Sequence, residues 1–240
     1  MTRIMSEAVK NIFDDISPTY DRLNHMLSLN IDKKWRKKTV GLIQKKKDDD
    51  FKVLDLCAGT YDLSIEILRQ FPNCQVTAAD FSQSMLDVGR PKIQNYLNTG
   101  QIKPVCCDAL NMPFDADDFD VILCGYGVRN FDHTEKGILE IKRVLKPGGQ
   151  ILVLEFFRPK NLLTKIFHKT YAGFVIPTLG RWVSGNSGAY AYLRDSIQGF
   201  ITLSEFKNIL NKNSFKHIKN KDFILAISSA VSAFKTDTAV

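Results

Sequence analysis

A glycine and two acids sit where alternating apolar and helical patterns meet. The segment VLDLCAGTYDL, residues 53–63, runs from an apolar stretch into a turn of small residues, where Gly59 lets the backbone approach a ligand closely. Asp80 ends the next apolar run, about 20 residues past the turn, where a carboxylate can accept hydrogen bonds from two ribose hydroxyls. Asp108 follows a third run and is placed to bond an adenine amino group. Together these residues predict a nucleoside-type cofactor site.

Each acid also has a local interpretation. Asp80 could belong to the N-terminal cap of a helix, helped by Ser82, and Asp108 could be an ordinary turn acid. Either alternative is favoured for one acid taken alone. The two acids together with the small-residue turn favour the cofactor site.

Tyr61 stands where loops of this kind usually have glycine. A negative φ at residue 61 would suit a tyrosine, whereas a positive φ would strain it by roughly 1–3 kcal/mol. Its ring could fill part of the cofactor site, or it could turn away and leave binding intact. Because Gly59, Asp62, Asp80 and Asp108 are all present, we expect a functional loop.

A sheet of parallel strands would bring these residues together. Apolar runs at 51–57, 75–80, 102–107, 119–125 and 149–157 predict strands, and helices fit at 62–70, 82–90, 134–145 and 203–212. The runs are continuous, as in parallel strands covered on both faces. Two final strands, at 214–219 and 223–229, would add an antiparallel edge pair. The prediction is an α/β fold with a doubly wound, seven-stranded sheet.

The pattern divides the chain into two parts. Residues 1–50 read as a helical N-terminal cap that ends in a basic stretch, 33–47, and three aspartates. Residues 51–240 form the main domain, with an insertion at about 157–200 that breaks the alternation. Within it, apolar residues from Leu162 to Phe174 can share one helical face. That face could contact a membrane, a greasy tunnel, a dimer partner or the core.

Composition narrows the class of protein. The 240 residues carry a net charge of +7, which admits nucleic acid, an anionic membrane surface or a basic soluble protein. There is no signal-peptide pattern and no run of about 20 apolar residues. The five cysteines show no metal-ligand spacing and suggest buried, reduced thiols. We expect a cytoplasmic protein.

Five stretches, in order, resemble one family. They are FDDISPTYDRLNHMLSLNIDKKWRK, LDLCAGTYDL, FSQSMLDVGR with GYGVRNF, LKPGGQILVLEFFRP and SGNSGAYAYLRDSI. They are similar to the C-methyltransferases of ubiquinone and menaquinone biosynthesis, and they cover about residues 10–200. The resemblance implies the Rossmann-like fold of class I methyltransferases, with N-terminal helices and a helical lid insertion, and S-adenosylmethionine as cofactor.

The resemblance also implies roles for residues. On the cofactor side it points to Thr60, Asp80, Asp108, Ala109 and Gly125, and the loop residues Asp55 and Gly59 complete the candidate cofactor set. On the substrate side it points to Tyr20, Arg129 and Asn130. The chain departs from the family at Tyr61, at Gly125, where a small hydroxyl residue is common, and in its C-terminal tail.

The implied reaction moves a methyl group from sulfonium sulfur to a ring carbon of a polyprenylated hydroquinone, chiefly demethylmenaquinol, with a benzoquinol as a second acceptor. Arg129 could stabilise the phenolate, or it could pair with Asp132 or Glu135. Asn130 could hold a water that removes the proton, and Tyr20 could position the ring or simply pack. No metal is expected.

Two other functions stay open at this stage. The basic charge favours a nucleic-acid methyltransferase, although no RNA-binding module is visible and we expect no nucleic-acid partner. Tyr61 favours a non-catalytic, methyltransferase-like scaffold for quinone enzymes or a membrane. The expected partner is a lipophilic polyprenyl quinol, with peripheral membrane contact and self-association both open.

Overall fold

The computed structural model describes residues 2–21, 28, 30–159, 187–224 and 226–236. Its strands are β1 (Lys52–Leu56), β2 (Gln75–Asp80), β3 (Ile102–Cys106), β4 (Phe119–Gly125), β5 (Leu145–Glu155), β6 (Phe215–Phe223) and β7 (Ser228–Lys235). They form one seven-stranded sheet in the order β3-β2-β1-β4-β5-β7-β6. Strands β1 to β5 pair in parallel, and β7 runs antiparallel between β5 and β6. The predicted fold class is confirmed.

The helices are α1 (Thr2–Ile16), α3 (Ile31–Val40), α4 (Asp62–Gln70), α5 (Gln83–Gly89), α6 (Gln94–Asn98), α7 (Thr134–Val144), α10 (Ser187–Gly199) and α11 (Leu203–Lys212), with 3₁₀ turns η1 (Ser17–Thr19), η2 (Arg90–Ile93) and η3 (Val128–Asn130). The four helices with predicted bounds, α4, α5, α7 and α11, follow those bounds to within one residue, and four more helices are present among the described residues. Side-chain hydrogen bonds explain where two of the helices begin. The Ser82 hydroxyl caps α5 by accepting from the Met85 N–H, and Thr202 and Glu205 form a reciprocal capping box at α11.

The last two strands differ from the prediction. We expected strands at 214–219 and 223–229, but β6 continues to Phe223 and β7 begins only at Ser228. β6 is an edge strand that leaves most of its polar residues exposed, so its ends are not marked by apolar residues. β7 is almost wholly buried because it lies between two strands and packs small residues on both faces.

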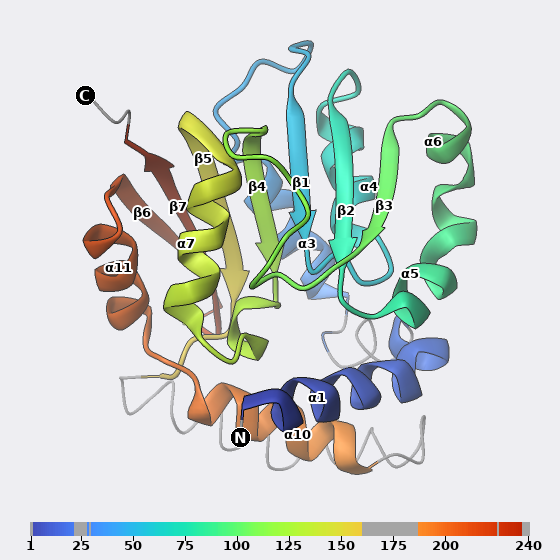
Figure 1. The fold of residues 1–240 in the computed structure, drawn as a ribbon, viewed down its shortest axis with the longest axis vertical. Coiled ribbons are helices and arrows are strands. Elements are labelled where there is room, and N and C mark those ends of the chain that lie inside the picture. Colours follow the sequence, from blue (N-terminus) through green and yellow to red (C-terminus); the bar gives the residue numbers. More distant parts are fainter. Residues whose placement is uncertain (1, 22–27, 29, 160–186, 225, 237–240) are drawn as a thin grey trace.

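Helices cover both faces of the sheet (Figure 1). One face packs on α7 and α11 through a core that includes Ile138, Ile141 and Phe206. The other packs on α3 and α4, with Val40 and Ile67 fully buried. This arrangement explains why the strand sequences are apolar on both faces.

A second layer lies across the carboxyl ends of the parallel strands. Figure 1 shows α1 and α10 side by side below the arrowheads of β1 to β5, and the two helices are in contact. The stretch at 162–174, where we predicted an amphipathic helix, lies outside the described residues. In the part of the chain that the structure describes, no helix is long and apolar enough to cross a membrane.

Candidate functional site

A cavity of about 370 Å³ opens where the parallel strands end. Its size lies within the usual range for small-molecule sites, and this end of a doubly wound sheet is where ligands bind. Seven of the ten predicted site residues line it: Tyr20, Gly59, Asp80, Asp108, Ala109, Gly125 and Asn130. Asp55, Thr60 and Arg129 are not among its lining residues.

Asp80 is the best-defined polar group in the cavity. Its carboxylate accepts hydrogen bonds from the Gly59 N–H at 2.8 Å and from the Ser82 N–H at 2.9 Å. The residue is only 7% exposed, and burial raises the pKa of its carboxyl to about 6. The two backbone donors fix the carboxylate, and its remaining lone pairs can accept from ligand hydroxyls. This geometry fits a ribose.

The glycine turn is shaped for close approach. Gly59 has a φ of +53°, and a Cβ at this position would lie 3.3 Å from the Met85 side chain. Asp108 is exposed at the rim, where its Oδ1 accepts from the Leu110 N–H at 2.8 Å. The second oxygen of Asp108 is therefore available for a ligand amino group.

The side chains of Asp55 and Thr60 form hydrogen bonds away from the cavity lining. Asp55 is fully buried, accepts from the Ser64 hydroxyl at 2.5 Å, and keeps one oxygen without a partner in the described structure. Burial raises the pKa of Asp55 to about 7. The Thr60 hydroxyl donates to Asp21 at 2.5 Å. Thr60 thus links the loop to the N-terminal segment, and Asp55 links β1 to α4 on the two sides of the loop in the chain.

Tyr61 turns away from the cavity. Its φ is +68°, the left-handed conformation that strains a tyrosine, so the strained alternative holds. The side chain is fully buried in the core under α4, and it lies against Gly89, where a Cβ would approach the Tyr61 ring to 2.6 Å. The ring is not among the groups that line the cavity. Strain at the turn is therefore offset by core packing, and the cavity stays open.

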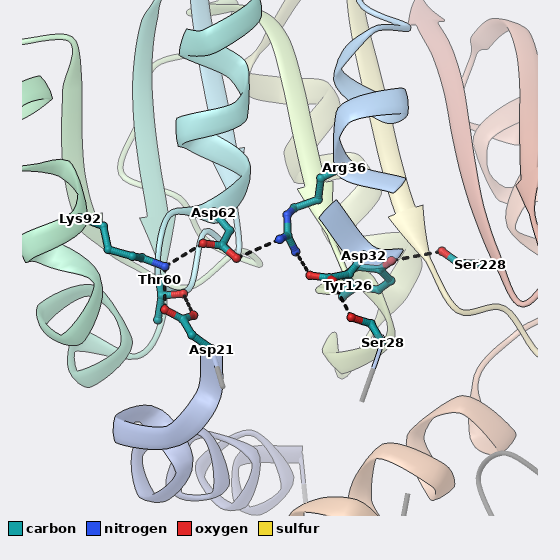
Figure 2. Close-up of polar contacts among 9 residues, drawn as sticks. All are labelled: Asp21, Ser28, Asp32, Arg36, Thr60, Asp62, Lys92, Tyr126 and Ser228. Atoms are coloured by element: carbon teal, nitrogen blue, oxygen red, sulfur yellow. Dashed lines mark hydrogen bonds and ion pairs between the residues drawn. The ribbon is translucent and has the colours of Figure 1, made fainter. Parts of the chain in front are cut away.

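A chain of charges holds the N-terminal segment to this loop (Figure 2). Lys92 bridges Asp21 at 2.8 Å and Asp62 at 2.7 Å, and Arg36 bridges Asp62 at 3.0 Å and Asp32 at 2.7 Å. Lys92 lies in η2, Asp62 begins α4, Asp32 and Arg36 both lie on α3, and Asp21 follows η1 in the chain. Sequence reasoning missed this network because its members are up to 71 residues apart.

One wall of the cavity is aromatic. Phe13 of α1 packs edge-on to Tyr20, Phe81 and Tyr192, with each pair of ring centroids 6.2 Å apart. Phe13, Tyr20 and Phe81 all line the cavity. The sequence pointed to Tyr20 as a substrate-side residue but gave no role to Phe13. Helical spacing places Phe13 on the same face of α1 as Val9 and Ile16. The result is an apolar wall suited to a ring.

Arg129 is committed to a buried ion pair. Its guanidinium pairs with Glu155 at 2.9 Å and also donates to the Tyr126 carbonyl, and the two charged side chains are 6% and 0% exposed. Burial disfavours its charge, but Glu155 outweighs this and holds the pKa of Arg129 above its usual value. The alternative suggested by the sequence, a pair with Asp132 or Glu135, was wrong in its partner, because the ion pair is made with Glu155. Glu155 ends β5 just as Asp80 ends β2, and this shared position is the signal that could have found it.

The cysteines differ in part from the expectation of buried thiols. Cys74 and Cys124 are buried, but Cys106 is exposed, and Cys106, Cys107 and Cys57 line the cavity. All five are free thiols. Within the described residues, no three His, Cys, Asp or Glu side chains gather as metal ligands would.

Comparison with known proteins gives the family. The family model described as "ubiE/COQ5 methyltransferase family" matches residues 1–235. A demethylmenaquinone methyltransferase of Bacteroides fragilis is 33% identical over 230 residues, covering 96% of this chain and 93% of that protein. The ubiquinone/menaquinone biosynthesis C-methyltransferase UbiE of Geobacter sulfurreducens is 34% identical over 230 residues, covering 95% and 89%. A mitochondrial 2-methoxy-6-polyprenyl-1,4-benzoquinol methylase of Caenorhabditis elegans is 32% identical, covering 95% and 80%.

Solved structures agree on the fold. A putative S-adenosyl-L-methionine-dependent methyltransferase from Methanococcus maripaludis aligns with a TM-score of 0.64 at 18% identity, covering 95% of each chain. A possible histamine N-methyltransferase from Thermotoga maritima aligns with a TM-score of 0.65 at 14% identity, covering 94% of this chain and 99% of that one. The chain therefore belongs to the ubiE/COQ5 methyltransferase family and is an S-adenosylmethionine-dependent methyltransferase.

Proposed function

We propose that this enzyme methylates a ring carbon of a polyprenylated hydroquinone, chiefly demethylmenaquinol. The observation that carries the proposal is similarity along nearly the whole chain to proteins named as quinone-pathway methyltransferases. The aromatic wall built by Phe13, Tyr20 and Phe81 supports it, because a flat ring packs well against such a wall. The nucleic-acid and scaffold alternatives have no comparable support.

The donor side would be held by residues on the strand ends. We assign the ribose to Asp80, the adenine amino group to Asp108, and close backbone approach to Gly59, with Ala109 and Gly125 lining the remaining space. When bound, S-adenosylmethionine supplies an electrophilic methyl group on its sulfonium sulfur. Asp55 and Thr60 contribute indirectly, by bracing the loop that carries Gly59.

The acceptor side would have to make a ring carbon nucleophilic. A phenol has a pKa of about 10, so loss of its proton near neutral pH needs stabilisation of the phenolate. Tyr20 and Asn130 are polar side chains that reach the cavity. Arg129 lies directly beside Asn130 in the chain, but Glu155 compensates its charge. We therefore assign ring positioning to Tyr20, hydrogen bonding to Asn130 and a supporting electrostatic role to Arg129.

The acceptor also sets where the enzyme must work. A polyprenyl tail resides in a membrane, so we propose a cytoplasmic enzyme that contacts the membrane surface peripherally. Exposed Lys33, Lys34, Lys37 and Lys38 on α3 give it a basic patch that suits anionic lipid. Flotation with phosphatidylglycerol vesicles tests the contact. Equal recovery with phosphatidylcholine vesicles would contradict the role of charge.

A product assay tests the function. The enzyme is incubated with S-adenosylmethionine and either a demethylated naphthoquinol or a demethylated benzoquinol, each with a short tail, and products are identified by mass spectrometry. We expect a carbon-linked methyl group on the naphthoquinol, with the benzoquinol as the second acceptor. Methylation of neither quinol, while S-adenosylhomocysteine still binds, would overturn the proposed substrate.

The cofactor assignment has its own test. Asp80→Ala should weaken binding of S-adenosylhomocysteine by about 10- to 100-fold, because hydrogen bonds to a charged group contribute about 1.5–3 kcal/mol. Asp87→Ala is the matched control, since Asp87 lies on the exposed side of α5 and bonds Gln83. Calorimetry measures both affinities, and near-equal values would refute the ribose assignment.

A further inference from the structure

Asn130 is fixed in the cavity wall by its backbone and by one oxygen. It ends η3, directly after β4, and its N–H donates to the Gly127 carbonyl at 2.9 Å. Its side-chain Oδ1 accepts from the Tyr192 hydroxyl at 2.6 Å. Nothing among the described residues accepts a hydrogen bond from its Nδ2. The carboxamide oxygen is therefore hydrogen-bonded, and its Nδ2 can still donate to a ligand.

Tyr192 is itself held from two sides. It lies on α10, which contacts both η3 and α1, and its ring meets Phe13 edge-on at 6.2 Å with an interplanar angle of 84°. Burial raises the pKa of Tyr192, so the phenol keeps its proton and remains a donor. A protonated phenol that donates to Oδ1 selects one orientation of the carboxamide.

We propose that Tyr192 is a positioning residue, which turns the Asn130 carboxamide so that its Nδ2 donates to the phenolic oxygen of the acceptor as that oxygen becomes a phenolate. This inference rests on the proposed function and deepens it. It gives Asn130 a direct contact with the acceptor, where the sequence suggested that Asn130 could hold a water for proton removal. The phenolic proton leaves to solvent.

The neighbouring groups explain why the donor is Asn130. Arg129 pairs with Glu155 and the Tyr126 carbonyl through its Nη1, so its charge is compensated, and it is not among the residues that line the cavity. Asp132 lines the cavity, and its negative charge opposes a second anion. Against that background, an oriented amide donor is the neutral group that can lower the energy of the phenolate.

The proposal can be tested without turnover, by measuring the pH at which a phenol bound in the cavity ionises. With S-adenosylhomocysteine present, 1-naphthol is bound and its ionisation is followed by absorbance across pH. We expect Tyr192→Phe to raise the pH of half-ionisation by about one unit, because one unit corresponds to about 1.4 kcal/mol of lost stabilisation. Asn130→Asp should raise it further, since a carboxylate still accepts from Tyr192 but has no donor. Tyr96→Phe, on α6 away from the cavity, is the matched control.

Turnover gives an independent reading. Tyr192→Phe should lower kcat with a naphthoquinol by about tenfold, move its pH profile to higher pH, and leave the affinity for S-adenosylhomocysteine unchanged. An unmoved pH profile and unmoved naphthol ionisation in both variants would overturn the proposal. So would loss of S-adenosylhomocysteine binding in Tyr192→Phe, which would make Tyr192 a packing residue. If the wild-type enzyme methylates no quinol, the proposed function fails separately, and the naphthol measurement still decides the roles of Tyr192 and Asn130.

Discussion

Replacing Tyr61 by glycine separates two opposing effects at the cofactor loop. Glycine accepts a φ of +68° without strain, so the substitution relieves about 1–2 kcal/mol. It also removes a ring that is fully buried and packs on Gly89. Truncation of a buried aromatic side chain destabilises a protein by about 3–5 kcal/mol. Glycine adds about 0.5–1 kcal/mol through the greater freedom of the unfolded chain.

The free energy lost with the packing of the ring should exceed the free energy gained by relief of backbone strain. We expect Tyr61→Gly to lower the free energy of unfolding by about 2–4 kcal/mol, which for a chain of this size corresponds to a fall in Tm of roughly 5–15 °C. Urea unfolding measures the first quantity and calorimetric melting the second. Because the ring does not line the cavity, the affinity for S-adenosylhomocysteine measured well below the melting temperature should change by less than about threefold.

Tyr61→Phe is the matched control, since it keeps the ring and the strain. It should stay within about 1 kcal/mol of the wild type. Two results would refute the reasoning. A glycine variant as stable as the wild type would mean that the ring contributes no packing, and a large change in cofactor affinity would place the ring in the binding site.

Two further predictions concern buried charges. Because burial raises the pKa of Asp55 to about 7, its stabilising contribution is complete below about pH 4 and is lost as pH rises through about 7. Asp55→Asn can still accept a hydrogen bond from Ser64, so its free energy of unfolding in urea should exceed that of the wild type by about 1–2 kcal/mol at pH 8. At pH 5 the two free energies should be equal. Free energies of unfolding that change in parallel with pH in the two proteins would contradict this prediction. Glu155→Gln should lower the free energy of unfolding by about 3–5 kcal/mol, because it leaves the buried charge of Arg129 without a partner. Arg69→Gln, which removes a surface ion pair with Glu66, is the control and should change the free energy of unfolding by less than about 1 kcal/mol. Equal effects of the two substitutions in chemical unfolding would argue against a buried pair.

Local sequence determined the framework of this site. Continuous apolar runs separated by helical patterns are enough to predict parallel strands, because such strands are buried on both faces. Once the strands are parallel, their carboxyl ends meet at one edge, and Gly59, Asp80 and Asp108 must come together there. The bounds of α4 also followed from the local pattern.

Tertiary structure alone decided where individual side chains point. Tyr61 faces the core and not the cavity because the backbone at that turn is left-handed and a space beside Gly89 receives the ring. Arg129 pairs with Glu155 across 26 positions of sequence, and Thr60 donates to Asp21 across 39. Local propensity carries no information about such partners, since they depend on how whole strands and helices pack. The sequence thus determined which residues reach this edge of the sheet, and packing determined which of them face the ligand.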